Sequence, residues 1–180
     1  MFGVVFVKIK DICEPKRGIR VVKSQLNSDG EFPVFQNTLT PMGYYDKYNC
    51  DDNSLYVVTA GSAGEIGYCN SKSWMADDCL YFVNLNMIKQ KYIYYYLLVK
   101  QDFIKSFVRK ASVPRLSRDI IENLIIPVVS IKEQDKIIGL LDKFDSYCND
   151  ISQGLPAEIE LRKQQYEYYR NKLLTFEELK

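Results

Sequence analysis

The spacing of apolar residues along the chain changes twice. Before residue 86, short runs rich in Val, Ile, Tyr, Phe and Thr alternate with clusters of Gly, Asn and Asp. Such runs are typical of strands, and such clusters are typical of turns, because their residues tolerate positive φ or bond their own backbone. The pattern predicts strands at 4–9, 32–35, 55–59, 66–69 and 79–83, and turns at 27–30 and 61–64.

Between residues 86 and 108 the apolar residues recur every three or four positions, which predicts one amphipathic helix. Its stripe consists of Tyr92, Tyr95, Tyr96, Val99, Phe103, Ile104 and Phe107. A polar loop at 109–117 follows. Beyond the loop, Ser117 is a good cap for a short helix at 118–123, and 124–127 is expected to be a closing strand.

From Ser130 onward the pattern is helical throughout. Ser130 and Glu133 have the spacing of a capping box, so a helix is expected from there to about residue 153. Gly154 and Pro156 interrupt it, and a second helix is expected from Pro156 to about 178, since proline is tolerated in a first helical turn. We expect the two helices to form a kinked, nearly collinear pair rather than a tight hairpin.

Both C-terminal helices carry a narrow apolar stripe with alternating steps of four and three residues. A stripe of this kind is buried by pairing with another helix rather than by wrapping a globular core. We therefore predict an interface with a second copy or another partner. Its residues would be Ile137, Leu141, Phe144, Cys148, Ile151, Ile159, Tyr166, Tyr169, Leu173 and Phe176, with Arg162 as the polar intruder that fixes the register.

Together these elements predict an α+β protein. A mixed, β-rich domain is expected at 1–129, followed by a helical, coiled-coil-forming region at 130–180. The chain has no apolar run long enough for a membrane helix, and its N-terminus reads as a strand rather than a signal peptide, so we expect no membrane association. Its five cysteines show no metal-type spacing and suggest free thiols in a reducing cytoplasm.

Charge is distributed unevenly along the chain. Residues 1–118 hold 16 Lys and Arg against 11 Asp and Glu, whereas residues 119–180 hold 8 against 12. A basic domain followed by an acidic helical tail suits a module that faces a polyanion and whose tail faces protein. Two solvated surfaces with a chance imbalance would give the same numbers.

The sequence lacks the residues that most catalytic sites need. It contains no histidine, which excludes Cys–His zinc sites and His-based acyl transfer. It also lacks the phosphate-binding glycine motifs and the Asn/Asp-Pro-Pro-aromatic loop of amino-methyltransferases. Asp77 and Asp78 are adjacent, so on a strand they would face opposite ways and are read as turn or surface residues. We therefore expect no catalytic residues, no metal and no cofactor.

Several polar segments have the chemistry to bind nucleic acid. The segment 109–118 offers four cations and two hydroxyl groups, which suit phosphate oxygens and guanine, and nearby turns add amide and aromatic groups. A basic loop is more often simply solvated, so this evidence alone is weak. The candidate DNA-binding residues are Asn37, Thr38, Lys47, Tyr48, Lys72, Arg109, Lys110, Ser112 and Arg115.

The C-terminal region contains IIGLLDKF at 137–144, GLPAEIE at 154–160 and QYEYYRNKLLTF at 165–176. These segments closely resemble the conserved region of type I restriction–modification specificity subunits. The remainder is similar to a target-recognition domain of that family, with VKIKDI at 7–12, GSAGEIG at 61–67 and IIP at 125–127.

The resemblance implies a non-catalytic subunit that reads double-stranded DNA. Full specificity subunits have two recognition domains and two helical regions, and this chain has one of each, so it looks like a half-subunit. It would pair with a second copy, read a symmetric bipartite site, and recruit modification subunits and a restriction subunit. Two alternatives remain at this point: a truncated assembly or decoy subunit, and a small stand-alone DNA-modifying enzyme.

Overall fold

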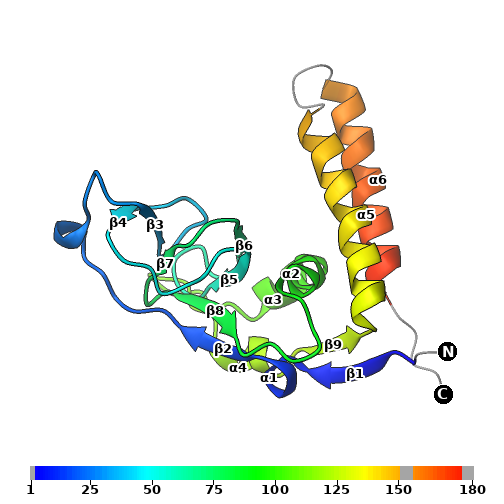
Figure 1. Ribbon diagram of the computed structural model, residues 1–180, viewed down its shortest axis with the longest axis horizontal. Coiled ribbons are helices and arrows are strands. Elements are labelled where there is room, and N and C mark those ends of the chain that lie inside the picture. The colour runs from blue at the N-terminus through cyan, green and yellow to red at the C-terminus, as the bar shows by residue number, and fades with distance from the viewer. Residues whose placement is uncertain (1–2, 151–155, 176–180) are drawn as a thin grey trace.

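The computed structural model describes residues 3–150 and 156–175, apart from the side chains of residues 149, 150 and 156–159. Two parts are visible in Figure 1: a β-rich head (residues 3–129) and two long helices. The helices are α5 (Ile131–Asp150) and α6 (Pro156–Leu174). The head contains β1 (Val5–Lys8), α1 (Ile9–Ile12), β2 (Glu14–Arg17), η1 (Lys23–Gln25), β3 (Phe32–Phe35), β4 (Gly43–Tyr45), β5 (Ser54–Val58), β6 (Ile66–Cys69), β7 (Trp74–Met75), β8 (Cys79–Val83), α2 (Gln90–Val99), α3 (Gln101–Ser106), α4 (Arg118–Glu122) and β9 (Ile125–Val128).

The strands of the head form three small sheets. Strands β2, β8, β5 and β6 make a four-stranded antiparallel sheet in that order. In the second sheet, with order β4-β3-β7, β3 runs antiparallel to β4 and parallel to β7. The third pairs β1 with β9, which brings the start of the chain beside the segment that enters α5. The predicted α+β class is confirmed.

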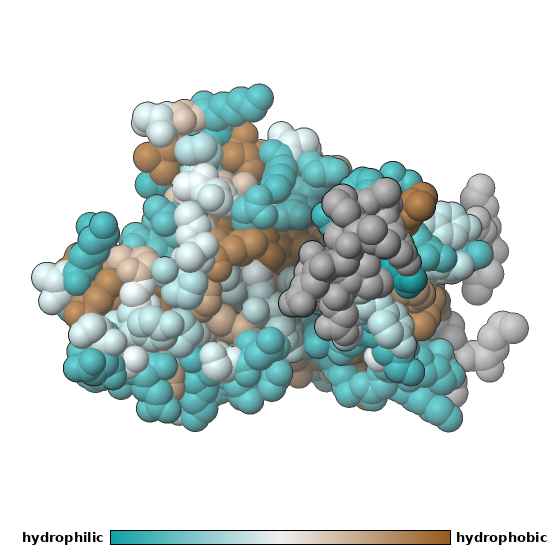
Figure 2. All heavy atoms as spheres, turned by 90° about the horizontal axis from the view of Figure 1, so that it is seen from above, coloured by the Kyte–Doolittle hydropathy of each residue, from teal (hydrophilic) through white to brown (hydrophobic). Residues whose placement is uncertain are grey.

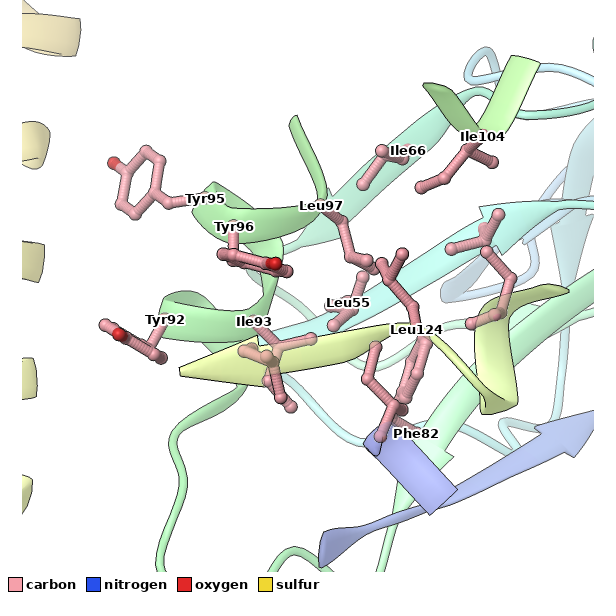
Figure 3. Packing of buried hydrophobic residues seen from close by; sticks show 14 of the residues in the cluster. Leu55, Ile66, Phe82, Tyr92, Ile93, Tyr95, Tyr96, Leu97, Ile104 and Leu124 are labelled. Carbon is pink, nitrogen blue, oxygen red and sulfur yellow. The ribbon is translucent and has the colours of Figure 1, made fainter. Parts of the chain in front are cut away.

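The main core lies where α2 packs against the four-stranded sheet. All five residues of β5 are buried, as expected for a central strand. Figure 3 shows Ile93 and Leu97 on the side of α2 nearest Leu55, while Tyr92 and Tyr95 project from the other side. Both sides of α2 are therefore covered, one by the sheet and the other by β9 and the long helices.

The tyrosines of α2 join these layers through their hydroxyl groups. The Tyr92 hydroxyl donates to the Pro127 carbonyl at 2.9 Å, and that of Tyr96 donates to the Ile125 carbonyl at 2.6 Å. The Tyr95 hydroxyl donates to the Asp142 carboxylate on α5. All three rings are buried, which confirms their prediction as helix core. Each hydroxyl thus has a partner where an unpaired buried one would be destabilising.

The prediction of a nearly collinear pair of C-terminal helices is wrong. Helices α5 and α6 lie side by side and antiparallel, forming a helical hairpin (Figure 1). Phe144 stacks on Tyr169 with ring centroids 5.5 Å apart, and the Cys148 thiol lies 3.9 Å from the Arg162 carbonyl. A collinear pair would leave both stripes in water, whereas the hairpin covers each with the other and with α2.

Other boundaries differ in smaller ways. The helix predicted at 86–108 is two helices that break at Lys100, and β2, β4 and β7 were not predicted. Strand β2 contains a proline and three charged residues, a composition that sheets tolerate at an edge, where β2 lies. The Ser130 hydroxyl accepts the Glu133 N–H at 3.3 Å, as the predicted cap requires. None of the helices in the described part of the chain is long and apolar enough to cross a bilayer.

Candidate nucleic-acid interface and helical hairpin

The candidate cations of segment 109–115 lie on a narrow, exposed loop, which we call the basic loop. The Arg109 N–H donates to the Arg115 carbonyl at 2.8 Å and the Arg115 N–H returns a bond of 3.2 Å, which closes the loop into a two-stranded turn. Arg109, Lys110, Ser112 and Arg115 are all exposed. No hydrogen bond or ion pair joins the three cationic side chains to any residue that the structure describes.

Backbone bonds hold the basic loop against two further turns. The Leu116 N–H donates to the Thr59 carbonyl at 2.8 Å, and the Gly61 N–H donates to the Pro114 carbonyl at 3.1 Å. Gly61 has φ +80, and a Cβ there would lie 2.8 Å from the Cβ of Asn37, so glycine permits the close approach. Asn37 and Thr38 are thereby brought beside the basic loop.

The other three candidate DNA-binding residues lie elsewhere. In the β4-β3-β7 sheet, Asn37 and Thr38 follow the C-terminal end of β3, whereas Lys47 and Tyr48 follow β4 and Lys72 precedes β7. The strand directions place these three at the opposite end of the sheet. There the Lys72 ammonium donates to the Tyr48 hydroxyl at 3.1 Å and lies 4.2 Å from its ring centroid. The nine candidates therefore form two groups.

A polar recess below the basic loop contains residues that the sequence did not single out as binding residues. Its volume is about 380 Å³, and it is lined by Arg17, Thr59, Asp78, Leu80, Arg115, Leu116 and Arg118. The Arg17 side chain donates from Nε to the Asp77 carbonyl at 2.7 Å, and Arg118 pairs with Glu122. Arg118 belongs to the recognised basic segment, but no local pattern marks Arg17, which reaches the recess through the pairing of β2 with β8.

The predicted helical stripe is largely covered within the chain itself. Leu141 is buried, and Ile137, Tyr166 and Leu173 are partly buried against the main core. Phe144 and Tyr169 stack on each other, although Tyr169 keeps 36% of its surface exposed. Ile151 and Phe176 lie outside the described residues, as does the side chain of Ile159.

A different set of apolar residues is exposed on the helical hairpin. Each lies one position before a stripe residue, which is a rotation of about 100° around its helix. Because the two helices are antiparallel, the rotation points the residues of both helices toward the same side of the hairpin. We call this set the outer face: Leu140, Tyr147, Leu161 and Tyr168, with 40%, 57%, 67% and 59% of their surface exposed. Figure 2, a view from above, shows a mostly hydrophilic rim with hydrophobic residues in the middle, between head and hairpin.

Where α2 meets the helical hairpin, the polar groups are paired; we call this region the junction. Gln134 is fully buried: its Oε1 accepts the Lys89 N–H at 2.9 Å, and its Nε2 donates to the Met87 and Val129 carbonyls at 2.9 and 2.8 Å. Lys91 lies 2.9 Å from the Asp142 carboxylate. Burial, and the hydrogen bond to Asp142, raise the pKa of Tyr95.

The described residues offer little catalytic chemistry. They contain no group of three His, Cys, Asp or Glu side chains that could hold a metal ion. All five cysteines are free thiols, and burial raises the pKa of Cys13 to about 12 and that of Cys50 to about 11. Those two thiols therefore stay protonated, and weakly nucleophilic, at neutral pH.

Comparison with known proteins identifies relatives that match nearly the whole chain. The family model for the type I restriction modification DNA specificity domain matches residues 1–161. The specificity subunit of the type I restriction enzyme MpnII from Mycoplasma pneumoniae is 34% identical over 174 residues. That match covers 94% of this chain and 52% of the relative, so the chain spans about half the length of this curated relative.

Solved structures show the same fold. The crystal structure of a type I restriction-modification system S subunit from M. genitalium superimposes with a TM-score of 0.74 at 22% identity, covering 94% of this chain and 46% of that one. That of an HsdS subunit from Thermoanaerobacter tengcongensis gives a TM-score of 0.68 at 15% identity, covering 96% and 45%. The sequence match therefore carries the family assignment, and these structures add the fold.

Proposed function

Because the chain belongs to the family of type I restriction modification DNA specificity domains, we propose that it is a non-catalytic subunit that reads double-stranded DNA. In this proposal the head contacts the DNA, and the chain recruits modification subunits, which supply the methyl donor, and a restriction subunit. The family places the chain in a restriction–modification system. The contacts that would perform the reading come from its own residues.

The observation that carries the DNA-reading proposal is the pairing state of the basic loop. Arg109, Lys110 and Arg115 have no partner among the described residues, yet backbone bonds at both ends fix the loop that bears them. Cations in this state can neutralise phosphates and release counterions without first breaking an internal ion pair. Asn37 and Thr38 lie beside them and add groups that can bond to base edges or to the backbone.

For the second part of the proposal, two copies associate through the outer face. The stripe expected to form this contact is largely used inside the chain, whereas Leu140, Tyr147, Leu161 and Tyr168 remain exposed. Two chains would together match the length of the M. pneumoniae relative, of which one spans 52%. Two-fold symmetry would then present two heads to a symmetric, bipartite site. Helix α5, with 20 residues, is about 30 Å long and would help to set their separation.

The test of the reading function is reconstitution with modification subunits from the same system. The complex should methylate DNA at one sequence, and omission of this chain should abolish that selectivity. The Arg109→Ala/Lys110→Ala variant should bind every DNA more weakly. If the chain alone binds a methyl donor and methylates DNA, it is an enzyme. If the complex assembles but binds no DNA, the chain is an assembly subunit.

The test of the dimer is the mass of the chain in solution by light scattering. We expect twice the 21.0 kDa of one chain for the wild type. The Leu161→Glu/Tyr168→Glu variant should reduce this mass to that of a single chain, because charges would replace the apolar contact. Lys163→Glu adds acidic charge at another exposed position of α6 and should leave the mass unchanged. A wild-type monomer at high concentration would refute the symmetric model.

A further inference from the structure

The recess below the basic loop contains a carboxylate and a guanidinium that bonds to no described residue. Asp78 and Arg115 both line it. The other two arginines of the lining are engaged elsewhere, Arg17 with the Asp77 carbonyl and Arg118 with Glu122. Arg115 makes no side-chain bond within the described residues, and the Asp78 carboxylate accepts from the Gln36 amide at the long distance of 3.5 Å. The recess thus presents the unpaired guanidinium of Arg115 as a donor group and the weakly bonded carboxylate of Asp78 as an acceptor group.

Thr59, directly after β5, bonds to the backbone of Asp78 and to that of Leu116, the residue next to Arg115. Its N–H and its hydroxyl donate to the Asp78 carbonyl at 2.7 and 2.9 Å, and its own carbonyl accepts the N–H of Leu116 at 2.8 Å. Ala60 forms a bridge with Arg115, and two bonds to Arg109 close the loop on the other side. The two side chains therefore project from backbone whose relative position is fixed before any ligand binds, which lowers the entropy cost of binding.

This combination of groups matches one base pair better than it matches a phosphate. In the major groove guanine presents two acceptors, N7 and O6, which suit arginine, and cytosine presents the N4 amino donor, which suits aspartate. A G·C pair offers both at once. A phosphate would bond to Arg115 but would be repelled by the Asp78 carboxylate, and the major groove admits a two-stranded ribbon like the basic loop.

We infer that Arg115 and Asp78 read a single G·C base pair from the major groove, Arg115 bonding to the guanine and Asp78 to the cytosine. This inference rests on the proposed DNA-reading function and adds to it a residue pair and the base pair that it selects. In a symmetric complex the same position would be read in each half-site. The flanking cations Arg109 and Lys110 would contact phosphates and carry no base preference.

The experiment uses the complex reconstituted with its modification subunits and selects bound sequences from a randomised DNA library. The wild type should select a motif that contains G·C at one position of each half-site. Arg115→Gln and Asp78→Asn should each reduce the preference at that position alone, by roughly 5- to 150-fold for the loss of about 1–3 kcal/mol of discrimination. Lys110→Ala, on the same loop, should weaken binding to all sequences equally and leave the motif unchanged.

Several outcomes would overturn the inference. If Asp78→Asn strengthens binding to every sequence equally, the recess holds a phosphate. If both variants bind DNA with an unchanged motif, the pair reads no base, while the DNA-reading function stands. If the wild-type complex selects no motif, the proposed function itself fails. Should Asp78→Asn fail to fold, Arg115→Gln decides alone, because its side chain is exposed and bonds to no described residue.

Discussion

Within the part of the chain that the structure describes, the polar side chains of the junction have partners, whereas the cationic side chains of the basic loop do not. At the junction, Gln134 makes three hydrogen bonds and Asp142 accepts from both Lys91 and Tyr95. On the basic loop, Arg109 and Lys110 have no partner among the described residues, although the backbone beside them is firmly bonded. Both regions hold their backbone in place, and only one satisfies its side chains internally.

Solvent exposure explains the difference and gives it a use. A buried polar group without a partner destabilises the fold by about 1–3 kcal/mol, so the junction must pair its groups. An exposed cation is already satisfied by water, and pairing it would stabilise the fold by at most about 1 kcal/mol. The basic loop therefore remains free to bind at little cost in stability. Substitutions that separate folding from binding should test this division.

The largest effect on stability should come from Gln134→Leu. Leucine fills a similar volume but leaves the Lys89 N–H and the Met87 and Val129 carbonyls, whose bonds to Gln134 are partly buried, without this partner. An unpaired buried group costs about 1–3 kcal/mol, and partial exposure favours the lower end for each of the three, so we expect the free energy of unfolding to fall by about 3 kcal/mol. Urea denaturation at a fixed protein concentration measures this decrease.

Lys163→Leu introduces the same side chain at an exposed polar position of α6 that lies away from the outer face, and is the control. It should change the free energy of unfolding by less than about 0.5 kcal/mol. Equal effects of the two substitutions would mean that the Gln134 bonds do not hold the head to the helical hairpin.

A smaller decrease is expected from Tyr95→Phe. The change removes the hydroxyl that donates to Asp142 but keeps the buried ring, and Asp142 retains Lys91. Hydrogen bonds to charged groups contribute about 1.5–3 kcal/mol, and partial exposure of this carboxylate favours the lower end of that range. Tyr44→Phe, which alters an exposed tyrosine of β4 outside the outer face, should have no measurable effect in the same denaturation experiment. Similar decreases for the two would argue against the Asp142 bond.

The sequence predicts local elements well because periodicity is a local property. The strands at 32–35, 66–69 and 79–83 match the structure, and the start of α5 follows from its cap. The direction of α6 relative to α5 could not be predicted in the same way. The interruption at Gly154 and Pro156 is compatible with a kink or a turn, and a stripe shows that a helix needs a partner without showing which one. In the folded chain, the partner of α6 is the apolar surface that α2 and α5 form together.

The candidate DNA-binding site likewise contains some residues that a local sequence pattern predicts and others that only the fold brings together. The cations of the basic loop are recognisable because they are adjacent in the sequence. Arg17 and Asp78 are separated by 61 positions and meet only because β2 pairs with β8. The adjacency of Asp78 to Asp77 predicts a turn or surface residue and gives no sign of a shared recess. Arginine and aspartate that converge through strand pairing leave no local signature.

The junction should also give a weak dependence of stability on pH. Burial and the nearby Asp142 carboxylate raise the pKa of Asp145, and Lys91 partly opposes this. Because the folded-state pKa is raised, the folded chain binds the proton more tightly, so this residue favours folding at low pH and less so as pH rises through its folded pKa. Asp145→Asn should therefore increase the free energy of unfolding slightly at pH 7, and the gain should vanish once the wild-type carboxyl is protonated. A gain that persists at low pH would contradict an electrostatic origin.

The smallest effect on folding, and a clear effect on binding, should come from Arg109→Ala/Lys110→Ala. Neither side chain bonds to a described residue, so the free energy of unfolding should change by less than about 0.5 kcal/mol. In the reconstituted complex, the slope of log affinity against log salt should flatten by about 0.9 for each phosphate that the variant no longer neutralises. Lys132→Ala/Lys163→Ala removes the same charge from exposed positions of α5 and α6 and should leave the slope unchanged. If the two double variants flatten the slope equally, net charge rather than the basic loop governs binding, and the contrast between loop and junction would no longer mark where the chain meets DNA.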